Sequence, residues 1–321
     1  MDKKQTISIT GGTGHLGHCL LLKLLDQKYR VKALYNRQVP LLKHPHLTWI
    51  KGNIAQANTF KEFLKDSDAL IHSAGLISIG DQSAKLVYQV NVVGTEHLIK
   101  ACLEYQVKMV YISSCTAVKE TLAHEVFKED RPYKTQNDFS YDYTKAMAEQ
   151  KVITAIKENK LSACILRPTS IIGPPDDRPS PFGKTILDLA AYKMPIVTSG
   201  GYNLVDVRDV SQTIINSLDK KLAGEVYLLS GSYVTIKEIA KIANPTKFFF
   251  KISIDLLLFL LPLIKWYDKL FGMPWPLSKE SLMTLKMAPV QMDHSKATNQ
   301  LNHQSRAPSE SILDLLSWHK K

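Results

Sequence analysis

The chain has 321 residues, of which 45% are apolar and 22% charged, so it can form one large α/β domain or two smaller ones. Its four cysteines are widely spaced, without a C-x-x-C pair or a His/Cys cluster, which argues against a disulfide framework and a metal site. The net charge of +11 comes from scattered basic residues, which favours a solvated basic surface over a nucleic-acid site and would also suit an anionic cofactor. The first ten residues have no signal-peptide core, which predicts a cytoplasmic location.

Strands alternate with helices through the first 168 residues. Apolar runs typical of strands occur at 6–10, 31–35, 47–51, 68–74, 107–114 and 161–168. Helical patterns fall between them, at about 15–28, 84–105 and 141–159. This alternation predicts an α/β protein with a Rossmann-type doubly wound parallel sheet and right-handed crossovers.

The pattern changes after Pro168. A proline-rich loop covers 173–183, and it is followed by mixed elements: a helix near 185–192, a strand over 225–230 and a short helix after Thr235. We therefore predict a dinucleotide-binding domain over 1–169 and a smaller, discontinuous substrate lobe over 170–321. A segment around 203–215 is expected to return to the first domain.

The stretch TGGTGHLG, residues 10–17, joins the first predicted strand to the first helix. Gly11, Gly14 and Gly17 follow each other at intervals of three, and Gly12, Gly14 and Gly17 satisfy G-x-G-x-x-G. Glycines at these places allow a tight turn and let a pyrophosphate approach the helix N-terminus. Because a strand precedes the motif and a helix follows it, the motif predicts dinucleotide binding.

The end of the second predicted strand bears on which dinucleotide is preferred. An acidic residue there would bond the ribose 2′-hydroxyl of NAD, whereas an arginine would accommodate the 2′-phosphate of NADP. The sequence offers Tyr35, Asn36 and Arg37, with Lys32 nearby and no acid. NADP is the predicted cofactor, with NAD as the alternative.

Tyr141 and Lys145 lie four residues apart in YDYTK, residues 141–145, so on a helix they share one face. A phenol with a pKa of ~10 is a poor acid–base group at neutral pH, and an adjacent ammonium would lower that pKa. The same ammonium can bond the nicotinamide ribose. The spacing favours a catalytic pair, while Tyr143 is expected to pack elsewhere.

An unbroken apolar run covers Leu256–Ile264 within residues 248–267. It is well short of the ~20 residues that span a bilayer, and Pro262 would kink a helix there. A buried core helix is one interpretation. The alternative is a peripheral membrane contact with an amphipathic rim, made of Lys265, Trp266, Tyr267 and Lys269.

Several stretches together resemble the extended short-chain dehydrogenases/reductases, the group that includes nucleotide-sugar epimerases and dehydratases. Within that group the chain is most similar to dihydroflavonol reductases and 3β-hydroxysteroid dehydrogenases. The likeness covers essentially the whole chain. The supporting stretches, besides the glycine loop and YDYTK, are IHSAG (71–75), NVVGT (91–95), VYISS (110–114), LRPTSIIGP (166–174) and VDVRDV (205–210).

The resemblance implies roles for individual residues. Tyr141 would be the acid–base group, Lys145 its partner, and Ser114 the hydroxyl that orients the reacting oxygen. The residues implied in cofactor binding, together with Tyr141 and Lys145, are Gly11, Gly14, His15, Leu16, Gly17, Asn36, Arg37, Asn53, Ile54, Ser73, Ala74, Gly75, Pro168 and Thr169. The family often dimerises through helices like those at 84–105 and 141–159, so a homodimer is expected.

The chain also departs from the family pattern. Asn53 replaces the acid that commonly meets the adenine, and Arg37 is displaced by one position from the usual arginine. The register at Ser114 leaves Ser113, Cys115 and Thr116 as neighbours that could take its place, and Ser114 could merely cap the strand.

Three further residues match recurring family positions. Asn91 could position a helix or take part in catalysis. Arg167 and Asp206 are interpreted as scaffold residues.

The resulting hypothesis is an NAD(P)-dependent oxidoreductase that transfers hydride between nicotinamide and a carbonyl or secondary alcohol. The apolar second lobe suits a bulky hydrophobic small molecule, and specificity is expected in that lobe and in the loop 76–83. Arg178 and Arg208 could instead bind a diphosphate, so a nucleotide-sugar epimerase or dehydratase with retained NAD is the alternative. A second alternative is a non-catalytic NADP-binding sensor.

Overall fold

A seven-stranded parallel sheet organises the first part of the chain. The computed structural model describes residues 5–37, 39–56, 60–77, 84–121, 125–271 and 278–320. The sheet order is β10-β6-β5-β4-β1-β2-β3, with every neighbouring pair parallel. Its strands are β1 Thr6–Thr10, β2 Arg30–Tyr35, β3 Leu47–Lys51, β4 Ala69–His72, β5 Lys108–Ile112, β6 Ala163–Pro168 and β10 Val226–Leu229. The predicted doubly wound sheet is confirmed.

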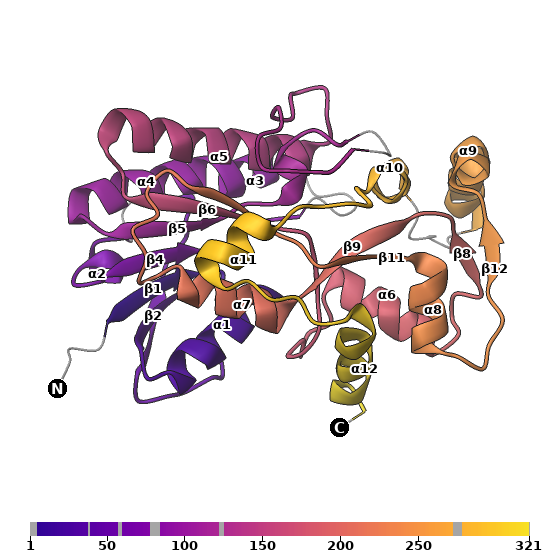
Figure 1. Ribbon diagram of the computed structural model, residues 1–321, viewed down its shortest axis with the longest axis horizontal. Helices are drawn as coiled ribbons and strands as arrows, with labels where there is room; N and C mark the ends of the chain where they lie inside the picture. Colours follow the sequence, from indigo (N-terminus) through magenta and orange to yellow (C-terminus); the bar gives the residue numbers. More distant parts are fainter. Residues whose placement is uncertain are drawn as a thin grey trace.

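Helices cover both faces of this sheet (Figure 1). On one face lie α1 His15–Asp26, α7 Val207–Asn216 and α11 Ser295–Leu301. On the other lie α2 Phe60–Leu64, α3 Ala84–Tyr88, α4 Gly94–Tyr105 and α5 Ser140–Asn159. Each face has its own apolar core, because the strands of a parallel sheet are buried on both sides.

The region predicted as one helix over 84–105 contains a π-helical turn, Gln89–Val93, between α3 and α4. Such turns widen the helix by one residue and are frequent at functional sites. Here the turn carries Asn91, whose side chain bonds residues outside the helix. The 3.6-residue periodicity of the sequence gave no sign of this insertion.

The second lobe is built on smaller sheets, at the right of Figure 1. One has the order β11-β9-β7, and the other pairs β12 with β8. These strands are β7 Ser170–Ile172, β8 Ile196–Thr198, β9 Gly201–Asp206, β11 Ser232–Thr235 and β12 Phe250–Ile252. The accompanying helices are α6 Pro181–Ala190, α8 Ile236–Ala243, α9 Ile254–Phe271, α10 Lys279–Met287 and α12 Pro308–Trp318.

Three elements from beyond residue 170, namely β10, α7 and α11, belong to the central sheet and its cover. β10 extends the sheet beside β6, and α7 packs on α1. α6 begins at Pro181, inside the stretch expected to be loop, because a proline at the first helical position loses no hydrogen bond and Ser180 caps the helix. The boundary between the two predicted domains stays a prediction.

Buried ionic contacts hold residues of α5 and α7 in place. The guanidinium of Arg167 bonds the carboxylate of Glu149, which is fully buried and also accepts from the hydroxyl of Tyr133. Asp206 caps α7 and pairs with Arg208. These contacts agree with the scaffold role predicted for Arg167 and Asp206, since removing one partner of such a pair typically costs about 3–5 kcal/mol.

The apolar helix α9 is neither fully buried nor fully exposed. Ile254, Leu257 and Leu261 pack into the second lobe, whereas Leu256 and Phe259 are exposed. The interpretation of a wholly buried core helix is therefore wrong. None of the described helices is long and apolar enough to cross a membrane.

Candidate active site

The predicted site residues gather at one edge of the central sheet. Parallel strands all end at the same edge, so the segments that follow them converge there. Gly11 follows β1, Asn36 and Arg37 follow β2, and Asn53 and Ile54 follow β3. Ser73, Ala74 and Gly75 follow β4, Ser114 follows β5, and Pro168 and Thr169 stand at the end of β6. Tyr141 and Lys145 reach this edge from the first turns of α5.

The glycine loop is shaped so that side chains cannot replace its hydrogens. Gly11 has φ +76°, and a Cβ there would lie 2.7 Å from the backbone nitrogen of Ala74. Gly17 lies in the first turn of α1, and a Cβ there would overlap the carbonyl of Gly11. No acidic residue occupies the first turn of α1. This tight turn and uncompensated helix N-terminus fit the pyrophosphate of a dinucleotide.

Several other predicted cofactor residues already have local partners. His15 bonds the carbonyl of Gly173 at 2.7 Å, and Leu16 packs on the core beneath α1. Asn53 uses its side-chain oxygen to accept from the backbone of Ala55, and Ile54 packs against Gly94. Thr169 donates to Asn203.

Only one of the two cations near the end of β2 is available for a phosphate. The ammonium of Lys32 bonds the carbonyls of Glu62 and Lys65 at the end of α2, so it is engaged elsewhere. Arg37 is exposed, and among the described residues it takes part in no ion pair. Arg37 is thus the remaining residue on which the NADP prediction depends.

The segment after β4 is held by the π-helical turn. Asn91 accepts from the backbone of Leu76 at 2.7 Å, donates to the Leu76 carbonyl, and donates to the hydroxyl of Thr144 on α5. All its polar atoms are used, so the structure agrees with the positioning role considered for Asn91. Ser73 and Ala74 are tied to Thr10 at the end of β1.

Lys145 is buried where β4 and β5 end. Its ammonium donates to the carbonyl of Ile112 at 3.0 Å and lies beside Gly75, whose added Cβ would be 3.3 Å from it. Burial lowers the pKa of Lys145 to about 8, and the carboxylate of Glu149 opposes that shift. The amine is therefore mostly protonated at neutral pH and can donate hydrogen bonds to a sugar hydroxyl.

Tyr141 and Ser114 meet across α5 and the end of β5. Burial raises the pKa of Tyr141 above its ordinary value, the nearby Asp142 and Cys115 raise it further, and a hydrogen bond with Ser114 opposes them. The prediction that Lys145 lowers the pKa of Tyr141 is wrong, because Lys145 is not among the groups that shift it. The phenol stays protonated at neutral pH, which is the state needed to donate a proton.

The uncertain register after β5 is narrowed by these contacts. Ser114 caps the short 3₁₀ helix Cys115–Ala117, whereas the buried hydroxyl of Ser113 has no partner among the described residues. Of the four neighbours, Ser114 is the one whose side chain lies close enough to lower the pKa of the Tyr141 phenol.

Asp142 is a site residue that the sequence reasoning missed. Its carboxyl is buried beside Tyr141 and bonds the side chain of Thr116. Burial raises the pKa of Asp142 to about 6, while the bond to Thr116 lowers it. An acid in the first turn of a helix normally complements the helix dipole, so nothing in the sequence pattern marked it as functional.

A pocket opens beside this cluster, between the sheet edge and the second lobe. Most of its lining is apolar or sulphur-containing, and its polar members include Asp142, Glu120 and Asn203. α10 contributes Met283 and Met287. Among the described residues, no arginine or lysine lines it. The loop 76–83, which was expected to shape the substrate site, lies outside the described residues from 78 onward.

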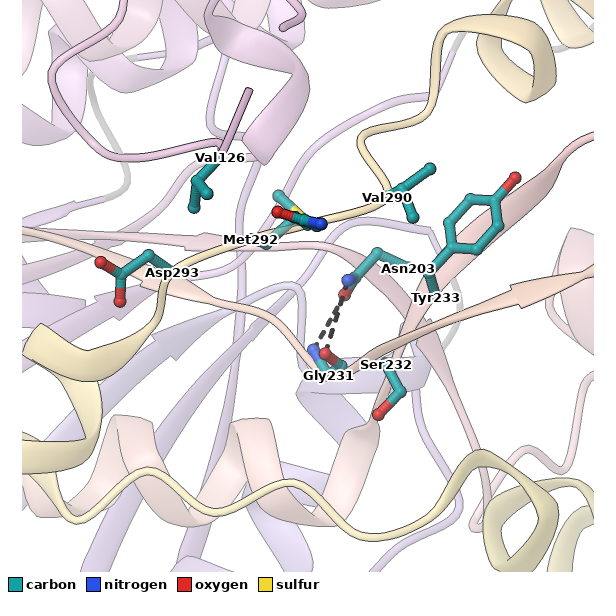
Figure 2. A pocket seen from close by; sticks show the side chains of 9 residues that line it. Val126, Asn203, Gly231, Ser232, Tyr233, Val290, Met292 and Asp293 are labelled. Carbon is teal, nitrogen blue, oxygen red and sulfur yellow. Dashed lines mark hydrogen bonds between the residues drawn. The ribbon is translucent and has the colours of Figure 1, made fainter. Parts of the chain in front are cut away.

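An open groove continues outward from the pocket (Figure 2). Asn203 and Met292 line both. The amide of Asn203 exchanges hydrogen bonds with the backbone of Gly231, which ties β9 to the turn before β11. Val126, Val290 and Met292 contribute apolar side chains to the groove, whereas Asn203, Ser232 and Asp293 make much of its wall polar.

Residues 7–230 match the model of the NAD dependent epimerase/dehydratase family. The chain belongs to this family. The family resemblance read from the glycine loop and YDYTK is thereby confirmed, and so is a nicotinamide dinucleotide as the cofactor.

Relatives within the epimerase/dehydratase family include enzymes of steroid and flavonoid chemistry. The chain is 33% identical over 240 residues to sterol demethylase protein B of Methylococcus capsulatus, covering 73% of this chain and 72% of the relative. It is 27% identical to a protein of Synechocystis named "Putative dihydroflavonol 4-reductase", covering 97% and 93%. With mouse 3 beta-hydroxysteroid dehydrogenase type 7 it shares 34% identity over 51% of this chain and 50% of that protein.

A solved structure, that of gox2253, superimposes with a TM-score of 0.85 at 25% identity, covering 99% of this chain and 98% of the other. Together with the named dehydrogenases and reductases, the family match makes the protein an NAD(P)-dependent oxidoreductase.

Proposed function

We propose that the protein transfers hydride between a nicotinamide cofactor and the carbonyl, or the corresponding secondary alcohol, of a bulky apolar small molecule. The observation that carries this proposal is the apolar lining, with three methionines, of the pocket that reaches Cys115 and Asp142, two neighbours of Tyr141. The names of the sterol- and steroid-related relatives support the same substrate class.

The residues have distinct tasks in this proposal. The nicotinamide, when bound, supplies or accepts the hydride. Gly11 and Gly17 let the loop pack closely against the chain, so that the N–H groups at the start of α1 can meet the pyrophosphate, and Lys145 bonds hydroxyls of the ribose. Tyr141 gives a proton to the reacting oxygen during reduction, or takes one during oxidation, and Ser114 orients that oxygen.

The raised pKa of Tyr141 bears on the direction of the reaction. A phenol that stays protonated at neutral pH is ready to donate to a carbonyl oxygen as that oxygen gains negative charge. In the oxidative direction the same phenol would have to lose its proton before it could accept one from an alcohol.

The pocket lining weighs against a nucleotide-sugar substrate. A diphosphate needs cations, preferably arginines that bind it bidentately. Of the two arginines considered, Arg208 is paired with Asp206 and Asp314, and neither it nor Arg178 lines the pocket. Two carboxyl groups line it instead: Asp142, which would repel a diphosphate, and Glu120, which is paired with Lys134.

For the cofactor we propose a preference for NADP over NAD. Arg37 is exposed at the end of β2, where the 2′-phosphate of NADP would lie. Arg37→Ala tests this preference, since it removes the positive charge of Arg37 without disturbing an ion pair among the described residues.

The function is tested with purified protein and a panel that contains cyclic and long-chain apolar ketones as well as nucleotide sugars. We expect loss of nicotinamide absorbance with an apolar ketone, tighter binding of NADPH than NADH, and a smaller difference between the two in Arg37→Ala. Retained NAD and epimerisation of a nucleotide sugar without net cofactor use would overturn the proposal. Cofactor binding without turnover of any member would favour the sensor.

A further inference from the structure

One face of α9 and the strand before it form an exposed apolar surface, which we call the α9 ridge. Leu256, Phe259, Leu263 and Trp266 recur at intervals of three and four, so they lie along one side of the helix. The ring centroids of Phe248 and Phe250 are 4.9 Å apart, in the segment that leads into α9. Phe259 is 78% exposed and Trp266 is 63% exposed.

The ridge is not needed to hold α9 in place. The opposite side of the helix, with Ile254, Leu257 and Leu261, already packs into the core of the second lobe. Figure 1 shows α9 at the outer end of that lobe, far from the central sheet. A contiguous apolar surface of this kind, left open on a single chain, marks an interaction site.

The charges around the ridge indicate which partner fits. Residues 247–269 contain four lysines and two aspartates. Lys247 and Lys251 are exposed and flank the phenylalanines, and one of the aspartates, Asp255, is neutralised by Lys286 of α10. Aromatic and leucine side chains that insert among acyl chains, with lysines at their rim, match an anionic lipid surface.

We propose that the α9 ridge docks the protein peripherally on an anionic lipid bilayer. None of the described helices can span a membrane, so α9 would lie in the interface with its buried side still packed on the protein. The net charge of +11 on the whole chain adds to the attraction.

Docking at this place would bring the substrate pocket close to the lipid. α10 pairs with α9 through Lys286 and Asp255, and the same helix lines the pocket with Met283 and Met287. An apolar substrate dissolved in the bilayer would then reach the pocket over a short path. This consequence rests on the proposed function, whereas the docking itself does not.

The experiment is flotation of the full chain with vesicles of phosphatidylcholine alone and of phosphatidylcholine mixed with phosphatidylserine. We expect flotation with the anionic vesicles, weaker flotation with the neutral ones and a decrease at high salt. The double variant Phe259→Glu/Leu263→Glu should partition roughly 100-fold less, because two large apolar side chains are lost from the contact. Leu313→Glu is the matched control, a 51% exposed leucine on α12, and should float like the wild type.

Near-UV circular dichroism and NADPH binding of each variant report whether it is folded. Absence of flotation of the wild type with anionic vesicles, or equal flotation of the folded double variant, overturns the proposal. A wild-type dimer in light scattering that becomes monomeric in the double variant, without vesicle binding, would assign the ridge to a second copy of the chain. Because flotation needs no substrate, failure of the proposed enzymatic function leaves this result unaffected.

Discussion

The sheet edge and the second lobe are built from different kinds of contact. At the sheet edge, backbone atoms come so close that Gly11 and Gly17 have no room for a Cβ, and Asn91 uses every polar atom of its side chain. In the second lobe the pocket is lined by flexible methionines such as Met283 and Met287. One region fixes geometry by steric exclusion and hydrogen bonds, while the other offers adaptable apolar surface.

This difference follows from what each region is proposed to bind. A dinucleotide has one shape, and its pyrophosphate must meet free backbone N–H groups directly, so the loop tolerates few changes. A bulky apolar substrate gains affinity mainly from burial, which many side chains can supply. Substitutions should therefore cost most at the glycine loop and least in the pocket.

The largest effect on stability and cofactor binding is expected for Gly17→Ala. The added methyl group would overlap the Gly11 carbonyl, so α1 must move away from the loop. We predict a loss of about 1–3 kcal/mol in the free energy of unfolding and NADPH binding weakened at least ~10-fold. Thermal unfolding and fluorescence titration with NADPH measure both.

Gly14→Ala is the control for this variant. Its methyl group would meet only the Gly11 carbonyl, at 3.4 Å, so the free energy of unfolding should fall much less. Equal losses of unfolding free energy in the two variants would show that steric exclusion is not what distinguishes Gly17.

A smaller effect is expected for Asp142→Asn. Burial raises the pKa of Asp142 from 3.8 to about 6, so the folded state holds a proton that the unfolded state has released between these values. The wild type therefore loses stability as pH rises through this window, and the variant should be more stable above pH 6 by about 1–2 kcal/mol. At pH values below the window the two proteins should be alike.

The same variant tests the link to Tyr141. Asp142 is one of the groups that raise the pKa of the phenol, so its removal should lower that pKa and still leave the phenol protonated at neutral pH. Urea unfolding from pH 4 to pH 8 measures the effect on stability, and kcat at pH 7 should stay within about tenfold of the wild type. A larger loss of kcat in the folded variant would give Asp142 a part in the reaction itself.

The sequence predicted the sheet edge well and the second lobe poorly. The spacing of the glycines and the interval between Tyr141 and Lys145 can be recognised in the sequence, because backbone geometry and helix periodicity impose them over a few residues. The loop between β1 and α1 and the helix α5 were placed on that basis. The environment of Tyr141 could not be predicted, since Cys115 reaches it only through the fold and the neighbouring Asp142 is buried only by the fold.

The pocket depends on contacts between segments far apart in the chain. Thr116, Asn203 and Met283 meet there, from the end of β5, from β9 and from α10. No local pattern marks such residues. The apolar run at Leu256–Ile264 predicted a helix but could not show which of its sides would face the core, because both sides are apolar.

The most direct test of the proposed catalytic role is kcat of Tyr141→Phe beside Tyr143→Phe, with NADPH and an apolar ketone that the wild type reduces. Each variant removes one phenolic hydroxyl, and the two positions lie two residues apart on α5. We predict that Tyr141→Phe lowers kcat by about 10²–10⁴-fold while NADPH still binds, and that Tyr143→Phe stays near the wild type. Wild-type kcat in Tyr141→Phe would contradict the assignment of Tyr141 as the proton donor.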